Sequence, residues 1–217
     1  MTAESGHGAS WVEVTYAGAT YDVKIEATAG TYAAGLRWGV STDDGEPGIV
    51  ALFDGDTANY SKGVAEPRSV GVSSAGQVVI ADWIEYGTST GSRVAVLDTA
   101  GEIRYADELD HGAVLVDISD DGAHIAVSTY ESAVRVYNVE TGELVGLHRC
   151  SVVARPVVEF VTENSATHIL VREAASGDRL YSITLDGAVV DESEAVKVRR
   201  YVGSFEPDGA ADWVEAA

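Results

Sequence analysis

The chain is poor in cysteine, in lysine and in long apolar runs: its 217 residues include one cysteine and three lysines. The lone Cys150 excludes an internal disulfide and a zinc site built on paired cysteines, and we expect it to be a buried structural thiol. No apolar run approaches the ~18–20 residues that span a bilayer, so we expect no membrane insertion. The opening residues, MTAESGHGAS, carry neither the basic nor the apolar region of a signal peptide, which favours the cytoplasm.

Catalytic and metal-binding motifs are also missing. The sequence contains no glycine-rich phosphate loop leading into a helix, no HExxH, no G-x-S-x-G and no EF-hand loop. Its five histidines are scattered, and no two of them stand at the spacing of a metal-binding pair. We therefore expect no metal site and no cofactor.

Acidic residues dominate what is present. Thirty-five aspartates and glutamates oppose fourteen lysines and arginines, for a formal net charge of −21. The carboxylates are dispersed along the chain, a composition that resembles that of halophilic proteins from organisms with a salt-filled cytoplasm. In about 1 M salt the Debye length is only about 3 Å, so self-repulsion is screened. An ordinary acidic protein with a basic partner is the alternative. Under either interpretation we expect no binding to nucleic acid, because affinity for phosphate rests on clustered lysine and arginine.

One hairpin recurs five times along the chain. Each copy is an alternating apolar run, a glycine turn and a second run, as in RVAVLDTAGEIRYAD from Arg93. Alternation with a period of two, punctuated by turn residues, predicts strands. The turn glycines, which lie 37 to 46 residues apart, are Gly18, Gly55, Gly101, Gly142 and Gly187.

A second kind of hairpin falls between successive copies of the first. Its clearest form is VLVDISDDGAHIAVSTY, residues 114–130, in which Asp121-Gly122 supplies the positive φ of a short turn. A copy over residues 27–42 aligns poorly. The remaining copies turn at Gly76, Asn164-Ser165 and Asp208-Gly209.

Two hairpins per repeat give four strands in about 43 residues, the size of one blade of a β-propeller. The sequence therefore predicts an all-β fold in one domain, residues 1–217: a five-bladed β-propeller of four-stranded antiparallel blades. The strands of a blade are labelled a to d from the channel outward. The chain begins with a c–d hairpin and ends with a–b strands, and their pairing would complete the fifth blade and close the ring.

Residues 116–146, VDISDDGAHIAVSTYESAVRVYNVETGELVG, carry the most specific pattern in the chain. The S-x-D-G turn, the I-A-V strand and the V-x-V-Y run ending in T-G-E resemble a unit of the WD-repeat and YVTN-type propellers. The resemblance implies a propeller in which the innermost strands surround a central channel, and it extends over about four of the expected blades.

Two carboxylates lie on the expected innermost strands, Asp117 and Glu159. Five-bladed propellers include glycoside hydrolases, which resemble one another in placing acidic residues around the channel. Two carboxylates are the minimum for cleaving a glycosidic bond, so a carbohydrate-active hydrolase or a lectin-like sugar-binding propeller is the alternative function. In a chain with 35 acidic residues, two such positions can also arise by chance.

Arginines precede the expected innermost strands, on connections that open onto one face around the channel mouth. Aromatic residues come from DWIEYGTSTGS, residues 82–92, predicted as the longest loop of that face. Arginines beside exposed aromatic rings are typical of interface hot spots. The alternative for the arginines is that each pairs with a neighbouring carboxylate. The alternative for the aromatic rings is that they are the last core residues of a strand. The leading prediction is a non-enzymatic interaction platform for a protein partner or an anionic ligand. Its candidate binding residues are Arg68, Arg155, Arg199, Arg200, Trp83 and Tyr86.

Overall fold

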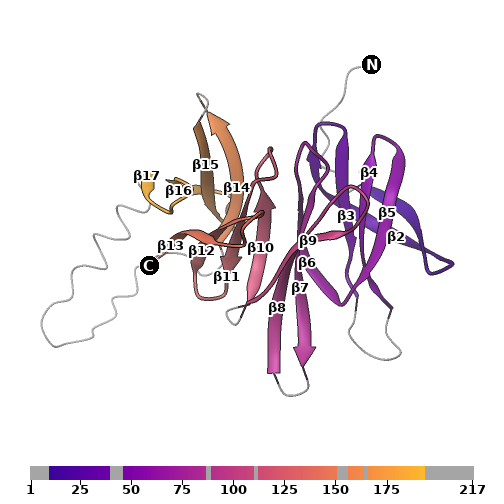
Figure 1. The fold of residues 1–217 in the computed structure, drawn as a ribbon. Coiled ribbons are helices and arrows are strands. Elements are labelled where there is room, and N and C mark those ends of the chain that lie inside the picture. Colours follow the sequence, from indigo (N-terminus) through magenta and orange to yellow (C-terminus); the bar gives the residue numbers. More distant parts are fainter. Residues whose placement is uncertain are drawn as a thin grey trace, which may run out of the picture.

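Strands account for the regular structure of the described part of the chain. The computed structural model describes residues 10–39, 46–86, 89–109, 112–150, 156–163 and 166–193. These ranges hold seventeen strands, paired antiparallel in four sheets (Figure 1). They contain no helix that is long and apolar enough to cross a membrane. The prediction of an all-β fold built from antiparallel sheets is confirmed.

Each sheet is formed by strands that are consecutive in the sequence. The first contains β1 (Trp11–Tyr16), β2 (Ala19–Ala29), β3 (Tyr32–Arg37), β4 (Gly48–Asp54) and β5 (Thr57–Val64). The second contains β6 (Glu66–Val72), β7 (Val78–Tyr86), β8 (Ser89–Leu97) and β9 (Ile103–Leu109). The third contains β10 (Ala113–Ile118), β11 (His124–Thr129), β12 (Ala133–Asn138) and β13 (Leu144–Arg149). The fourth contains β14 (Pro156–Glu163), β15 (Ala166–Glu173), β16 (Arg179–Ile183) and β17 (Val189–Glu192).

The predicted glycine turns of the described residues lie where the sequence places them, and the turns predicted at Asn164-Ser165 and Asp208-Gly209 lie outside the described residues. At the β10–β11 turn, Gly122 has a φ of +70°, a conformation that a residue with a Cβ adopts at a cost. Asp121 Oδ1 accepts hydrogen bonds from Ser119 Oγ and from the Ala123 N–H, which fixes the turn further. The five glycines of the other hairpin, from Gly18 to Gly187, likewise have positive φ.

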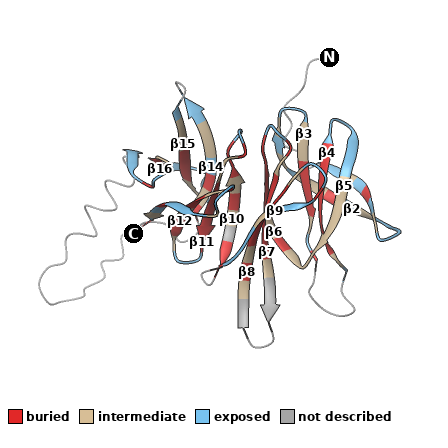
Figure 2. Ribbon diagram, viewed as in Figure 1, coloured by how far each residue is buried: buried red, intermediate tan, exposed pale blue. Residues whose placement is uncertain are grey.

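The four sheets stack in chain order, and every interface between neighbouring sheets holds an apolar core (Figures 1 and 2). Each fully buried aliphatic side chain contributes about 1.5–3 kcal/mol to folding. Central, fully buried residues of the three cores are Leu52 and Val78, Val96 and Ile125, and Val134 and Ile169. Successive four-stranded sheets packed face to face are the arrangement of propeller-type repeats.

The first sheet differs from the predicted blade because it has five strands. Strand β2 is eleven residues long and pairs with β1 through its first half and with β3 through its second, with an irregularity between Ile25 and Ala27. The sheet curls until Ser61 Oγ on β5 donates a hydrogen bond to the Thr15 carbonyl on β1. The curled sheet encloses a core of its own, centred on Val23 and neighbouring side chains of β1 and β4.

The N-terminal hairpin therefore lies in the first sheet, whereas the sequence predicted it to be half of a fifth blade. The second strand of this hairpin, β2, also pairs with β3, so backbone hydrogen bonds join the N-terminal hairpin to the rest of the first sheet. The C-terminal strands expected to pair with it, within residues 201–217, lie outside the described residues. Four sheets are seen, and a closed ring of five blades is not established by them.

Three of the four strands predicted to be innermost are β6, β10 and β14, and β10 is joined to each of the other two; the fourth, residues 201–205, lies outside the described residues. The Val116 N–H donates to Ser69 Oγ at 3.2 Å, and the Phe160 N–H donates to Asp117 Oδ2 at 2.7 Å. A cavity of about 420 Å³ runs beside them and is lined by residues of β2, β6, β10 and β14. The four sheets thus share one central space.

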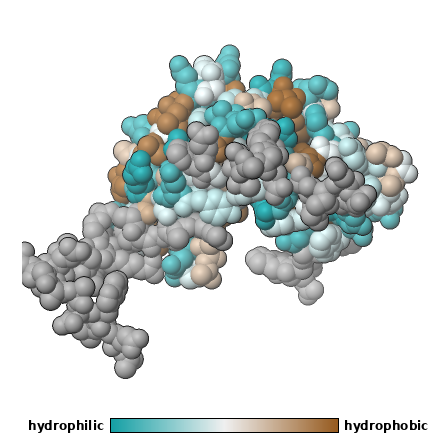
Figure 3. Space-filling model, turned by 90° about the horizontal axis from the view of Figure 1, so that it is seen from below, coloured by the Kyte–Doolittle hydropathy of each residue, from teal (hydrophilic) through white to brown (hydrophobic). Residues whose placement is uncertain are grey.

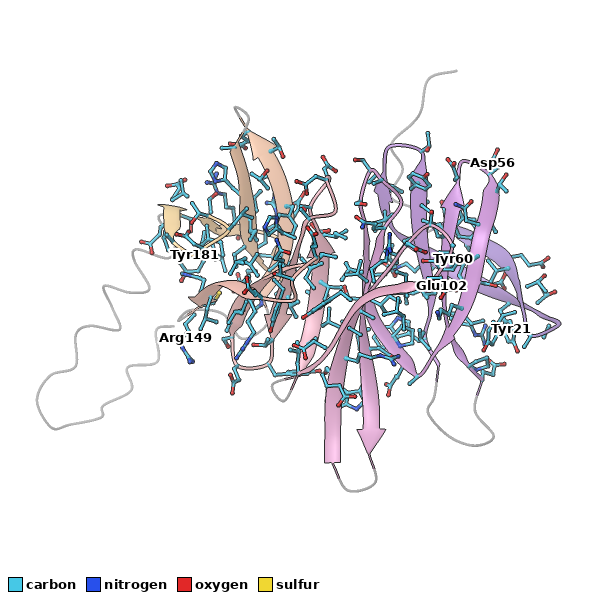
Figure 4. The ribbon with its side chains drawn as sticks, viewed as in Figure 1. Tyr21, Asp56, Tyr60, Glu102, Arg149 and Tyr181 are labelled. Atoms are coloured by element: carbon cyan, nitrogen blue, oxygen red, sulfur yellow. The ribbon has the colours of Figure 1, made fainter. Side chains whose placement is uncertain are left out.

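A polar seam joins the first and second sheets at their outer strands. Figure 4 shows Tyr60 on β5 beside Glu102, in the turn between β8 and β9. Lys62 Nζ donates a hydrogen bond to the Gly101 carbonyl at 2.7 Å, and burial raises the pKa of Tyr60 well above its usual value. The seam fixes the angle between the two sheets and hence the position of β6, on which the candidate site is built.

Candidate functional site

The candidate site is a cluster of one arginine and three aromatic rings where the first three sheets meet. The Arg68 guanidinium lies 5.1 Å from the ring centre of Trp38 and 5.7 Å from that of Trp83. Trp83 in turn meets Tyr130 edge-to-face, with 6.0 Å between ring centres. We call Trp38, Arg68, Trp83 and Tyr130 the arginine–tryptophan cluster. Its members come from β6, β7 and the ends of β3 and β11.

Backbone hydrogen bonds to a buried carboxylate hold the cluster in place. Asp82 is 2 % exposed, and its Oδ1 accepts a hydrogen bond from the Glu66 N–H at 2.7 Å. Its Oδ2 accepts one from Arg93 Nη2, also at 2.7 Å. Asp82 therefore fixes the start of β6, and Glu66 forms an ion pair with Arg68 two residues further on. The Ala65 N–H also donates to Asp82 Oδ2, at 3.4 Å, and a buried carboxylate with these three partners is a rigid support.

The cluster is open to solvent on one side. Trp38 is 57 % exposed, whereas Trp83 and Arg68 are half-buried. Trp38 and Arg68 line a cavity of about 250 Å³ whose other residues come from β2, β3, β6, β10 and β14. Large aromatic side chains exposed beside a cavity are uncommon on a monomer surface and mark binding sites.

Two of the predicted binding residues, Arg68 and Trp83, are brought together by the fold. Both alternatives weighed for the arginine hold at Arg68: it pairs with a neighbouring carboxylate and it also stacks on aromatic rings. The others cannot be placed: the side chain of Tyr86 and all of Arg155, Arg199 and Arg200 lie outside the described residues. The predicted ring of arginines stays a prediction.

Sequence reasoning misjudged the predicted loop of the site and missed Trp38, Asp82 and Tyr130. The predicted loop over residues 82–92 is instead the end of a hairpin, since β7 runs to Tyr86 and β8 begins at Ser89. Trp38 was missed because it falls in the repeat copy that aligns poorly. Asp82 was missed because its burial depends on the neighbouring β6, and no local pattern in the sequence reports that contact.

The two predicted carboxylates do line one space, the 420 Å³ central cavity. Burial is the main cause that raises the pKa of Asp117 to about 6, and nearby Glu159 and Asp120 add to it. The N–H groups of Phe160 and Ile118 act in the opposite direction by donating hydrogen bonds to the carboxylate. Glu159 is about half exposed, and its Oε2 lies 3.1 Å from Arg172 Nε in an ion pair.

Metal and thiol chemistry find no support in the described residues. Those ranges contain no group of three or more histidine, cysteine, aspartate or glutamate side chains able to hold a metal ion. Cys150 is buried, and burial raises the pKa of its thiol to about 12, so it is uncharged at neutral pH. Its predicted structural role agrees with its place in the core between the third and fourth sheets.

Comparison with known proteins assigns the chain to no family. No family model matches the chain, and no curated protein matches it. Among solved structures, BamB from Moraxella catarrhalis is 17 % identical with a TM-score of 0.49, over 72 % of this chain and 51 % of BamB. A protein of unknown function from Bacteroides caccae is 12 % identical with a TM-score of 0.46, over 76 % of this chain and 64 % of that one. The chain spans about half the length of BamB, and at these identities neither likeness assigns a function.

Proposed function

We propose that the chain is a non-enzymatic protein-binding module that uses the arginine–tryptophan cluster as its contact surface. The observation that carries this proposal is Arg68 held between two indole rings, one of which is more than half exposed. Tryptophan, tyrosine and arginine are the residues in which binding energy concentrates at protein interfaces. Here all three residue types meet on rigid strands.

The cluster is arranged for binding before a partner arrives. Arg68 is fixed by Glu66 and by two rings, so little side-chain entropy remains to be lost on association. Its guanidinium already faces a carboxylate, which favours a protein partner with aromatic or aliphatic side chains over a free anion. Figure 3 shows hydrophobic residues in separate patches among hydrophilic ones on the face it displays, as expected for a surface that works through a few anchors.

Affinity capture with variants tests the proposal. The tagged protein, Trp38→Ala, Arg68→Gln and the control Arg104→Gln are each incubated with a native lysate at molar salt. Arg104 is exposed on β9 and pairs with Asp98, so its replacement changes the same charge away from the cluster. We expect a partner that the unaltered protein and Arg104→Gln retain and that both cluster variants lose. Equal recovery with all four proteins would show that the cluster is not the contact surface.

Catalysis by Asp117 and Glu159 is the second candidate function. It is favoured by the raised pKa of Asp117, about 6, which would let the group hold a proton for a leaving group in mildly acidic solution, beside a second carboxylate in one cavity. The ion pair of Glu159 with Arg172 and the hydrogen bond from Phe160 to Asp117 support a structural role instead. Release of reducing sugar that disappears in Asp117→Asn would establish the hydrolase.

We further propose that residues 201–217 supply strands of a fifth blade that closes a five-bladed, WD-repeat-like or YVTN-type ring. The shared central cavity supports this, because β2 and β14 from the first and fourth sheets both line it. The closing blade would pack against the first sheet, which already contains the N-terminal hairpin. Deletion of residues 205–217 should then abolish the cooperative unfolding transition, and a truncated chain that keeps it argues against closure.

The acidic composition supports a salt-filled cytoplasm as the working environment. With 35 acidic residues and three lysines, the chain has the dispersed excess of carboxylates found in halophilic proteins. The salt dependence of its unfolding temperature tests this proposal.

A further inference from the structure

A third cavity, of about 670 Å³, adjoins the 250 Å³ cavity beside the arginine–tryptophan cluster and shares Glu26, Leu36 and Trp38 with it. Register pairs Trp11 on β1 with Lys24 on β2, and Lys24 with Leu36 on β3, so these three side chains lie on one face of the sheet. Trp38 follows β3 and also lines the cavity. A buried Leu36 and two tryptophans from separate strands therefore form the apolar part of its lining.

Both tryptophans are largely exposed, Trp11 at 61 % and Trp38 at 57 %. Burying an indole in a core would stabilise the fold, so two that are left exposed in the lining of one cavity call for another reason. Neither ring is needed to fill the curled sheet, whose core is built from Val14, Val23 and their neighbours. The exposed indole faces are available to a ligand.

The polar part of the lining has as many cations as carboxylates, and one more carboxylate, Glu46, pairs with Arg37 from outside the lining. It consists of two carboxylates, Asp22 and Glu26, and two cations, Lys24 and Arg37. Lys24 Nζ lies 2.6 Å from Glu26 Oε1. Arg37 pairs with Glu46 and lies 5.2 Å from the ring centre of Tyr21, a residue that Figure 4 shows at the outer end of the first sheet. The cations are thus held in place, and the cavity offers fixed donors and acceptors.

We infer that this cavity, the Trp11–Trp38 cleft, binds a neutral saccharide. One face of a sugar ring presents C–H groups that pack on the electron-rich face of an indole. Its hydroxyls both donate and accept, which matches an equal number of carboxylates and cations. An anionic ligand gains no net attraction here, and a purely apolar one would leave four charged groups desolvated. The volume lies within the ~300–1,000 Å³ of small-molecule sites.

Titration of tetrasaccharides into the whole protein at molar salt tests the inference. The neutral probes are maltotetraose, cellotetraose and N-acetylated chitotetraose, and the charged probe is tetragalacturonate. Calorimetry and tryptophan fluorescence follow binding. We expect at least one neutral probe to bind with a millimolar or lower dissociation constant, and Trp11→Ala to raise that constant about tenfold or more. Failure of every neutral probe to saturate, or stronger binding of tetragalacturonate, overturns the inference.

Two further variants separate this site from the arginine–tryptophan cluster. Trp11→Ala should lose saccharide and keep the protein partner, because Trp11 does not belong to the cluster. Trp83→Ala should lose the partner and keep saccharide, because Trp83 belongs to the cluster and does not line the cleft. Trp11 is exposed, so its truncation should leave the unfolding temperature nearly unchanged. Unaltered saccharide affinity in a folded Trp11→Ala variant contradicts the inference.

Discussion

Asp117 is a half-buried acid whose protonation state affects the stability of the junction between the third and fourth sheets. Its pKa is raised from 3.8 to about 6, so the folded protein holds this proton more tightly than the unfolded chain does. The contribution of Asp117 to stability is therefore full below pH 3.8 and is lost as the pH rises through about 6. At neutral pH the ionised, half-buried carboxylate destabilises the fold.

Asp117→Asn should stabilise the protein at neutral pH and not in acid. Asparagine keeps an oxygen that can accept the hydrogen bond from Phe160 and carries no charge to bury. We expect the free energy of unfolding at about pH 7.5 to rise by on the order of 1–3 kcal/mol, and the gain to vanish toward pH 4. Urea unfolding at both pH values measures it.

Asp120→Asn is the matched control for this variant. Asp120 is exposed, lines the same cavity and carries the same charge, so its replacement reports the general effect of removing one carboxylate. An equal gain for the two variants at about pH 7.5, or a gain for Asp117→Asn that persists at pH 4, would contradict the role of burial.

At the scale of elements, β13 lies against the turn between β16 and β17 with no room for a side chain between them. An added Cβ on the buried Gly146 would overlap the Leu185 carbonyl oxygen and lie 2.9 Å from the Gly187 nitrogen. Both are backbone atoms, which cannot move aside as a flexible side chain does. This close approach of backbones helps to set how the third and fourth sheets pack at their outer strands.

Gly146→Ala should therefore destabilise the protein by about 1–3 kcal/mol or more, since overpacking forces the backbone apart. Thermal and urea unfolding measure the loss. Gly91→Ala on β8 is the control, because an added Cβ there meets no atom within 4 Å and its φ is not positive. A Gly146→Ala variant as stable as Gly91→Ala would mean that the turn can shift freely.

The strands and turns could be predicted from this sequence. Which strands pair with one another could be predicted only in part. Alternation and glycine turns report that a segment such as β10–β11 is a hairpin, because both signals are local. They do not report that β2 has hydrogen-bonded neighbours on both sides, since that depends on its length and on the irregularity near Ile25. The site was predicted where arginine and tryptophan were conspicuous, at Arg68 and Trp83. It was missed at Asp82 and Trp38, whose roles arise from contacts between sheets.

At the scale of the whole molecule, unbalanced negative charge should make stability depend on salt. The net charge of −21 repels itself over a Debye length of about 10 Å at 0.1 M salt but only about 3 Å at 1 M. An exposed ion pair such as Arg179 with Asp191 contributes little to stability, so screening it loses little. Added salt therefore weakens the repulsion between carboxylates more than it weakens the ion pairs, and we expect a large rise in stability.

We expect the unfolding temperature to fall steeply as potassium chloride is lowered from molar to ~0.1 M concentrations. Sucrose at matched osmolality serves as the control, because it is excluded from the protein surface without screening charge. An unfolding temperature that is the same at both salt concentrations, or restored equally by sucrose, would remove the support for a salt-filled cytoplasm.

The first sheet has a core of its own, whereas the cores described for the later sheets are each shared with a neighbour. During synthesis the ribosome releases this sheet first, and its curled strands can bury Val23 and Phe53 before the second sheet exists. Each later sheet then emerges beside a finished surface on which it can fold, so the order of assembly follows the order of translation. A nascent chain arrested after the first sheet should already be protected from protease, and one that begins at β6 would have no such template.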